Sequence, residues 1–203
     1  MRYLLLLMLL FVIPVREMTL QAQSAGYVVI SEFATRGLVG NASGEFVECY
    51  NPVDAAVIIS GWELQYRAST GSSYQTLATV PQGTVMPARS FFLFAGPTWD
   101  GTPAADMQWN SSGIADNATI RMVMATGEEV DRVAFGTGND PEGSPAPHHG
   151  TTPNNNSVER RASAASTAAS LAAGGAGEFA GNGWDSNDNE ADFIVQIHGR
   201  NPQ

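Results

Sequence analysis

Residues 44–64 read GEFVECYNPVDAAVIISGWEL, and this stretch says more about the fold than any other part of the chain. Phe46–Tyr50 is rich in apolar and aromatic residues, as a strand requires, and the Asn-Pro pair that follows favours a tight turn. Residues 58–64 predict a second strand, kinked at its Ser-Gly pair, with Trp62 as a large apolar anchor. The stretch therefore predicts a strand, a turn and a strand.

The segments around this stretch have the composition of further short strands. They are residues 27–33, 74–80, 90–95, 119–124 and 130–135. Residues 90–95 are almost continuously apolar, which is expected of a strand between two layers, whereas the last two segments alternate polar and apolar residues. Gly, Pro and Asn separate the segments, and none has sustained helical periodicity. The pattern predicts an all-β sandwich or barrel.

The composition changes after Gly136. Residues 137–156 contain four prolines and read as an irregular loop, and residues 157–160 form a short ordered piece. Residues 162–177 consist almost entirely of Ala, Ser, Thr and Gly. Their alanines could form a fraying helix, but a Gly-Gly pair and the lack of an amphipathic face favour a mobile low-complexity insertion. Residues 183–195 predict a turn that leads into a last strand of the sandwich.

Residues 1–24 have the features of a secretory signal peptide. Arg2 provides the positive start, and residues 4–13 form an apolar run that is too short to span a bilayer. The sequence Ala-Gln-Ser precedes Ala25, and we predict cleavage before this residue. An uncleaved N-terminal anchor is the alternative. The sequence thus predicts one exported domain, residues 25–203, that is secreted or periplasmic and free of the membrane after cleavage.

The chain is strongly acidic. Its formal net charge is −10 at pH 7, and every basic residue is an arginine. Such a charge repels phosphate backbones and anionic membranes, so we expect neither nucleic acid nor a membrane surface as a partner. The charge is compatible with the binding of cations.

Cys49 is the only cysteine, so no disulfide can form within the chain. Its neighbours Phe46, Val47 and Tyr50 predict a strand that is buried on at least one face, and hence a small core residue. A reactive thiol and a disulfide between chains are the alternatives.

Several short motifs occur in the order in which lamin-tail domains of exported bacterial proteins have them, and the chain resembles that family from about Val28 to Pro202. The motifs are ISEF at 30–33, EFVE at 45–48 with YNP at 50–52, SGW at 60–62, PA at 87–88 before the strand at 91–95, the hairpin at 127–135, SVER at 157–160, DN at 188–189, ADF at 191–193 and NP at 201–202. The resemblance implies an immunoglobulin-like β-sandwich. In this family the domain often accompanies nucleases, adhesive modules or sorting signals, and it carries no shared catalytic residue. The chain departs from the family at Cys49, where a larger aliphatic residue is usual, and in its longer insertion at 162–177.

An acidic cluster in the last predicted turn is the strongest candidate for a metal site. It comprises Asp185, Asp188, Glu190 and Asp192, together with Asn187 and Asn189. Calcium takes six to eight hard oxygens from flexible loops of this kind, although the cluster lacks the Gly and Glu positions of an EF-hand. The alternative is a turn whose Asp and Asn side chains cap its own backbone amides.

Two further groups of residues invite a functional interpretation. His148 and His149 are adjacent in a Pro-rich loop without the spacing of helical zinc ligands, so we expect solvated loop residues. Trp99, Trp109 and Trp184 could form an aromatic platform for sugar rings, or they could seal the end of the sandwich. The sequence contains no nucleophile elbow of the G-x-S-x-G type and no phosphate-binding glycine loop, so we expect no catalytic residues.

These features favour a non-catalytic exported module that binds a protein, cell-surface or matrix partner or has a structural role. A calcium-dependent module that binds carbohydrate or extracellular matrix is the alternative. An accessory domain of a secreted enzyme or nuclease is the third candidate. A fold alone does not decide among them, because one fold supports many functions.

Overall fold

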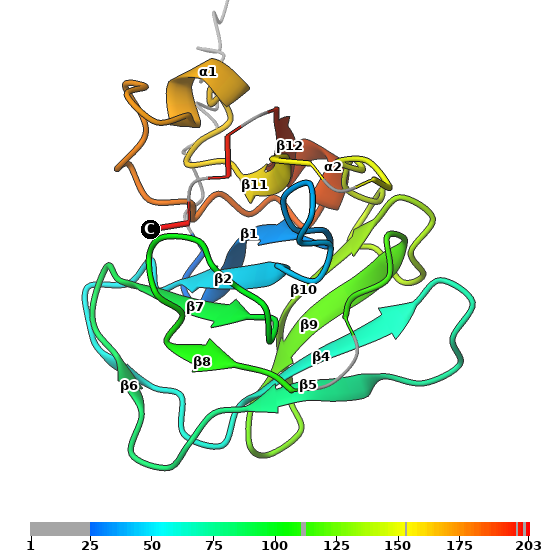
Figure 1. The fold of residues 1–203 in the computed structure, drawn as a ribbon. Coiled ribbons are helices and arrows are strands. Elements are labelled where there is room, and N and C mark those ends of the chain that lie inside the picture. The colour runs from blue at the N-terminus through cyan, green and yellow to red at the C-terminus, as the bar shows by residue number, and fades with distance from the viewer. Residues whose placement is uncertain (1–24, 111–112, 153, 198, 201) are drawn as a thin grey trace, which may run out of the picture.

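The computed structural model describes residues 25–110, 113–152, 154–197, 199–200 and 202–203. Within these residues, two β-sheets face each other and form a sandwich (Figure 1). The six-stranded sheet has the order β12 (Phe193–Gln196), β11 (Ser157–Arg160), β1 (Val29–Ala34), β2 (Phe46–Tyr50), β7 (Phe91–Ala95) and β8 (Met107–Gln108). The four-stranded sheet has the order β10 (Glu129–Phe135), β9 (Ala118–Val123), β4 (Glu63–Ala68) and β5 (Gln75–Thr79). A separate ribbon joins β3 (Val57–Ile58) to β6 (Val85–Met86). The all-β sandwich predicted from the sequence is confirmed.

The core lies between the two sheets, where inward-facing side chains of both sheets pack together. Phe33 on β1 contacts Phe135 on β10 and Phe193 on β12, with ring centroids 4.6 Å and 6.0 Å away. Trp62, the predicted anchor, is buried immediately before β4, and Cys49 is buried on β2 as expected of a core residue. Removal of this apolar surface from water is the main source of stability in a chain with one cysteine.

The prediction of one kinked strand at residues 58–64 is wrong in one respect, because the structure divides this segment between two sheets. Ile58, at its start, belongs to β3 and pairs with Val85 of β6, whereas its end belongs to β4. Gly61 forms the corner with a φ of 75°, a left-handed conformation that glycine adopts without strain. The kink at the Ser-Gly pair is therefore a passage from one sheet to the other.

The C-terminal third is more regular than its composition indicates. The short piece predicted at Ser157–Arg160 is β11, an inner strand between β1 and β12. The predicted turn before the last strand contains a short helix, α2 (Asn189–Asp192). The Ala- and Ser-rich insertion contains another, α1 (Ala168–Leu171), whose last residue is buried. The mobility expected of residues 162–177 stays a prediction.

The loop predicted between β7 and β9 contains the two-residue strand β8. Met107 and Gln108 pair in parallel with Phe94 and Ala95. Two residues are too few for any periodicity, so the sequence pattern could not indicate this strand.

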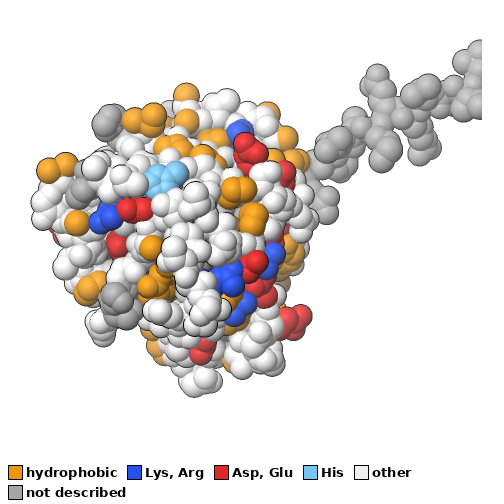
Figure 2. Space-filling view, turned by 90° about the vertical axis from the view of Figure 1, so that its right-hand side faces the viewer, with side chains coloured by type: hydrophobic (Ala, Val, Ile, Leu, Met, Phe, Trp, Pro, Cys, Tyr) orange, Lys and Arg blue, Asp and Glu red, His pale blue; other side chains and the backbone are white. Residues whose placement is uncertain are grey.

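The surface combines charged and uncharged regions. Figure 2 shows one side of the molecule, on which acidic and basic side chains form small groups of mixed sign among mostly uncharged ones. In the described part of the chain, no helix is both long and apolar enough to cross a membrane. The predicted signal peptide, residues 1–24, lies outside the described residues.

Candidate functional site

The four predicted metal ligands lie on α2 and on the turn that leads into it. Asp188 is the N-cap of α2, and its side chain accepts hydrogen bonds from the backbone amides of Glu190 and Ser144, both at 3.1 Å. Glu190 itself points to solvent. Each bond satisfies a backbone donor at a helix start or in an adjoining loop, which is what a self-capping turn does.

The other two acidic residues are held in the same way. Asp192 accepts bonds from the backbone amide and the hydroxyl of Ser186, with distances of 3.0 Å and 2.6 Å to its Oδ1. Asp185 accepts a bond from the amide of Asn187 at 3.0 Å, two residues on, and another from the hydroxyl of Tyr27. Both carboxyl groups are buried, so they also need a positive charge nearby.

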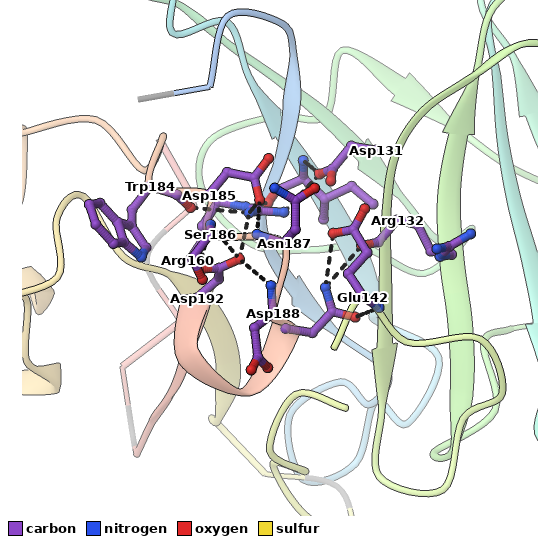
Figure 3. Close-up of polar contacts among 12 residues, drawn as sticks. Asp131, Arg132, Glu142, Arg160, Trp184, Asp185, Ser186, Asn187, Asp188 and Asp192 are labelled. Carbon is purple, nitrogen blue, oxygen red and sulfur yellow. Dashed lines mark hydrogen bonds and ion pairs between the residues drawn. The ribbon is translucent and has the colours of Figure 1, made fainter. Parts of the chain in front are cut away.

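Arg160 on β11 supplies that charge. It is the centre of a group that we name the Arg160 cluster, formed by the buried Asp131, Arg160, Asp185 and Asp192 and the partly buried Glu142 (Figure 3). The Nη2 atom of Arg160 lies 2.9 Å from Oδ2 of Asp131. Its Nη1 atom lies 3.7 Å from Oδ1 of Asp185 and 3.8 Å from Oδ2 of Asp192. One guanidinium thus faces carboxylates from β10, from the turn before α2 and from α2 itself.

The remaining donors of Arg160 bond the backbone. Nε donates to the carbonyl of Ile30 on β1 at 2.7 Å, and Nη1 donates to the carbonyl of Trp184 at 3.1 Å. The guanidinium also lies over the ring of Phe193, 4.5 Å from its centroid. Arg160 has no exposed surface, and it connects both sheets to the C-terminal segment.

Asn189 extends the cluster toward β10. Its Oδ1 accepts bonds from the amides of Ala134 and Glu142, at 3.0 Å and 3.1 Å. Its Nδ2 donates to the carbonyl of Arg132 at 3.1 Å and to Glu142 at 3.3 Å. The first residue of α2 is thereby attached to a strand of the opposite sheet.

The electrostatics of the cluster follow from burial. Burial raises the pKa of Glu142 to about 7, and the nearby carboxylates of Asp131 and Asp185 raise it further. Burial also raises the pKa of Asp131 and of Asp192, although Arg160 opposes the shift in both. The carboxyl groups outnumber the single cation, and burial together with their mutual repulsion opposes their ionisation while Arg160 favours it.

The geometry favours the self-capping turn over the calcium site. The guanidinium of Arg160, and not an open space, lies among Asp131, Asp185 and Asp192. In the parts of the chain that the structure describes, no group of three or more His, Cys, Asp and Glu side chains is arranged to hold a metal ion. The calcium interpretation stays a prediction that a binding experiment can decide.

The expectation that both histidines are solvated is wrong for His149. This side chain is 3% exposed, and its Nε2 accepts a bond from the backbone amide of Thr35 at 3.1 Å. Burial lowers the pKa of His149 to about 4, so the ring is neutral at pH 7. The ring of His148 stacks on it at 5.6 Å and is partly exposed. The loop is drawn inward because Ala146 forms a parallel bridge with the end of β10.

The three tryptophans considered as an aromatic platform are mostly enclosed. Trp109 is 1% exposed and packs in the main core, and Trp184 is also buried. Trp99 is partly exposed and packs on Phe46, with ring centroids 5.3 Å apart. With two of the three rings enclosed, the geometry favours the sealing role over a shared platform for sugars.

Sequence reasoning missed Arg160 and Asp131, the two central residues of the cluster. Arg160 lies between Glu159 and Arg161, and Asp131 is followed by Arg132, so each has a charged neighbour and no local signal marks either residue as buried. The side of the strand that each residue faces follows from pairing between segments far apart in the sequence.

The two sheets and the buried polar cluster define an immunoglobulin-like β-sandwich module, closed by its C-terminal segment. The sequence model described as Lamin Tail Domain matches residues 21–137, which is more than half of the chain, and the protein belongs to the lamin tail domain family. The matched residues contain β1 to β10 but neither β11 nor β12, so Arg160, Asp185 and Asp192 lie outside them. No curated protein matches the chain in a sequence comparison.

Proposed function

We propose that this protein is an exported, non-catalytic module that binds a protein, cell-surface or matrix partner through the surface of its sandwich. The observation that carries the proposal is the Arg160 cluster. Its central groups are buried and bonded to the backbone of several segments, so they hold the domain together and do not face a substrate. Membership of a family of immunoglobulin-like domains supports the same role.

The chemistry of the buried groups supports a binding role over a catalytic one. A catalytic acid or base must reach a reacting atom within hydrogen-bond distance. Arg160 and Asp192 have no exposed surface, and His149 is neutral and bonded to Thr35. The partner therefore has to be recognised by exposed strands and loops.

Export is supported by the sequence features of residues 1–24 and by the start of the domain. Ala25, the predicted first residue after cleavage, is buried, and its backbone nitrogen donates to the carbonyl of Gly183 at 2.9 Å. Cleavage before Ala25 would leave this packed residue intact.

The proposal is tested in the organism that makes the protein. We expect N-terminal sequencing of protein recovered outside the cytoplasm to begin at Ala25. We also expect labelled protein to bind intact cells or their matrix saturably, with competition by unlabelled protein and loss of binding after heat unfolding. Soluble cytoplasmic protein that begins at Met1, or an absence of saturable binding, would contradict the proposal. A hydrolytic activity that one point mutation abolishes would contradict its non-catalytic part.

A further inference from the structure

A hollow of about 210 Å³ lies on the outer face of the four-stranded sheet, and none of the residues that line it belongs to the Arg160 cluster. Small residues create it. Gly61 and Gly127 have φ angles of 75° and 86° at the turn before β4 and in the β9–β10 hairpin. A Cβ atom at Gly61 would lie 3.0 Å from the Cβ atom of Ala125, so larger side chains here would fill the space.

The register of the strands places two rows of side chains beside the hollow. Glu63 of β4, Val123 of β9 and Glu129 of β10 are direct neighbours in one row. Gln65 and Arg121 are neighbours in the next row. The residues that alternate with them, such as Leu64 and Ile120, face the core, so these rows face outward. Val123 thus forms an apolar floor with a carboxylate on either side.

Hydrogen bonds fix the polar wall of the hollow. Arg121 donates from Nε and Nη2 to Oε1 of Gln65, at 3.0 Å and 2.8 Å, and from Nη1 to Glu129 at 3.1 Å. Its guanidinium lies 3.6 Å from the centroid of the Tyr74 ring. The Nε2 atom of Gln65 in turn donates to Oε2 of Glu63 at 2.6 Å. Such a wall does not need to be ordered when a ligand binds, which lowers the cost of binding.

The two carboxylates Glu63 and Glu129 are balanced in number by Arg121 and Arg132, but both arginines pair with Glu129, so Glu63 has no cation in direct contact within the part of the chain that the structure describes. Among the described residues, no arginine or histidine pairs with Glu63, whose side-chain bonds come from the neutral groups of Gln65 and Thr76. Glu63 is half-buried, so water screens its charge less than on an open surface.

We propose that this hollow binds a lysine or arginine side chain of a basic protein partner, with Val123 under the aliphatic stem and Glu63 as the counter-charge. The inference rests on the proposed binding function and specifies the chemistry of the partner. Long basic side chains bury their methylene groups on apolar surface while the charged end pairs with a carboxylate. The net charge of −10 attracts a basic partner over a distance.

Other ligand classes fit the wall less well. Calcium and magnesium take six or more oxygen ligands, whereas Glu63 is the one carboxylate on the wall that no arginine already engages. An anion would lie against Glu63 in a molecule that is already acidic. A side chain with one positive charge and an apolar stem matches both parts of the hollow.

The probe for the test is the peptide acetyl-Gly-Lys-Gly-Lys-Gly-amide, with norleucine in place of lysine as the control peptide. We expect the lysine peptide to shift the backbone amide resonances of Gly61 and Gly127 in an NMR titration of the whole protein. We expect Glu63→Gln to weaken binding about three- to fivefold, the size of a partly exposed ion pair. Ala125→Phe should abolish binding without a change of charge, because the ring fills the hollow.

Glu190→Gln is the matched control, because it removes the same charge from an exposed residue on α2. We expect it to weaken binding less than twofold, about the effect of general attraction to an acidic surface. Equal weakening by Glu63→Gln and Glu190→Gln would overturn the proposal, and so would equal binding of the norleucine peptide. Amide spectra of the variants report whether each is folded. If the protein binds cells saturably but Glu63→Gln binds the lysine peptide normally, the inference fails while the proposed function stands.

Discussion

Arg160 shows how one buried residue can hold distant segments together. Removing a guanidinium from water costs several kcal/mol, and this cost is offset only when carboxylates and carbonyls surround the group. Asp131 and the carbonyls of Ile30 and Trp184 supply those contacts from β10, β1 and the turn before α2. The same contacts make any single replacement costly, since the partners stay buried.

We expect Arg160→Leu to lower the free energy of unfolding by about 3–5 kcal/mol, because Asp131 would remain buried without its cation. Urea denaturation followed by tryptophan fluorescence measures the change. Arg89→Leu is the control, since Arg89 pairs with Asp54 on the exposed surface and should contribute little. A double replacement of Asp131 and Arg160 by apolar residues should recover part of the loss. Equal stability of the Arg160 and Arg89 variants would contradict the structural role.

A row of three buried glutamates is a second feature at the residue scale. Glu48, Glu32 and Glu159 lie directly opposite one another on β2, β1 and β11. Ser31 and the backbone amide of Gln203 donate hydrogen bonds to Glu48. Burial raises the pKa of Glu48 to about 8, and the Glu159 carboxylate adds to the shift.

The raised pKa predicts a pH-dependent stability. The folded protein keeps the proton of Glu48 up to about pH 8, whereas the unfolded chain releases it near the ordinary value of 4.5. This contribution to stability is therefore complete below pH 4.5 and is lost as the pH rises through 8. In the Glu48→Gln variant the side chain at position 48 cannot ionise. The free energy of unfolding of this variant, relative to that of the wild type, should therefore rise from about pH 5 to about pH 9.

Urea denaturation of both proteins across this range provides the measurement. His149 acts in the opposite direction. Its pKa is about 4 in the folded protein and 6.5 in the unfolded chain, so its contribution to stability is lost as the pH falls from 6.5 toward 4. His149 is present in both proteins, so its contribution cancels in the difference. A difference in stability that does not change with pH would mean that Glu48 is ionised in the folded protein at pH 5.

At the scale of elements, α2 depends on its surroundings. A helix of four residues is far too short to be stable alone. Asp188 caps its start, Asp192 fixes the preceding turn through Ser186, and Asn189 attaches it to β10. The acidic composition of the segment is therefore explained by capping and by pairing with Arg160.

We expect Asp188→Ala to destabilise the protein by about 1 kcal/mol, the usual cost of losing an N-cap. We also expect the wild-type melting temperature to be the same in calcium and in chelator at matched ionic strength, which removes the effect of general screening. Differential scanning calorimetry measures both. A rise of several degrees with calcium that Asp188→Ala abolishes would restore the metal interpretation.

At the scale of the whole molecule, the C-terminal segment completes the sandwich. β11 pairs with β1 and carries Arg160, and β12 pairs with β11 and brings Phe193 to the core (Figure 1). The residues that match the family model end at residue 137, before both strands. Without them, β1 would expose an unpaired edge, and Asp131 would lose its cation.

We therefore expect a protein of residues 25–137 to lack cooperative unfolding, although it contains most of the matched residues. Amide resonances should be poorly dispersed, and the chain should aggregate through its exposed edge. The protein of residues 25–203 is the control and should unfold in one transition. A shorter protein with dispersed resonances and a sharp transition would mean that β11 and β12 are accessory.

The local sequence pattern is sufficient to predict most of the strands and the class of fold. Alternation in residues 119–124 and 130–135, the apolar run at β7 and the ordered motifs all act over a few residues, and side chains in strands follow a period of two. The Asp and Asn residues before β12 predict a turn, because their side chains bond backbone amides a few residues away, which is also a local effect.

The positions of strands in the sheets and the burial of charged and polar residues depend on pairing between distant segments. No local sequence pattern specifies that pairing. The division of residues 58–64 between two sheets, the inner position of β11 and the burial of His149 each depend on which strands lie side by side. From the sequence alone, Arg160 is indistinguishable from a surface arginine. In the folded protein, β1, β10 and the turn before α2 surround it. A buried charge is stable only where carboxylates and carbonyls converge on it, and that convergence exists only in the folded chain.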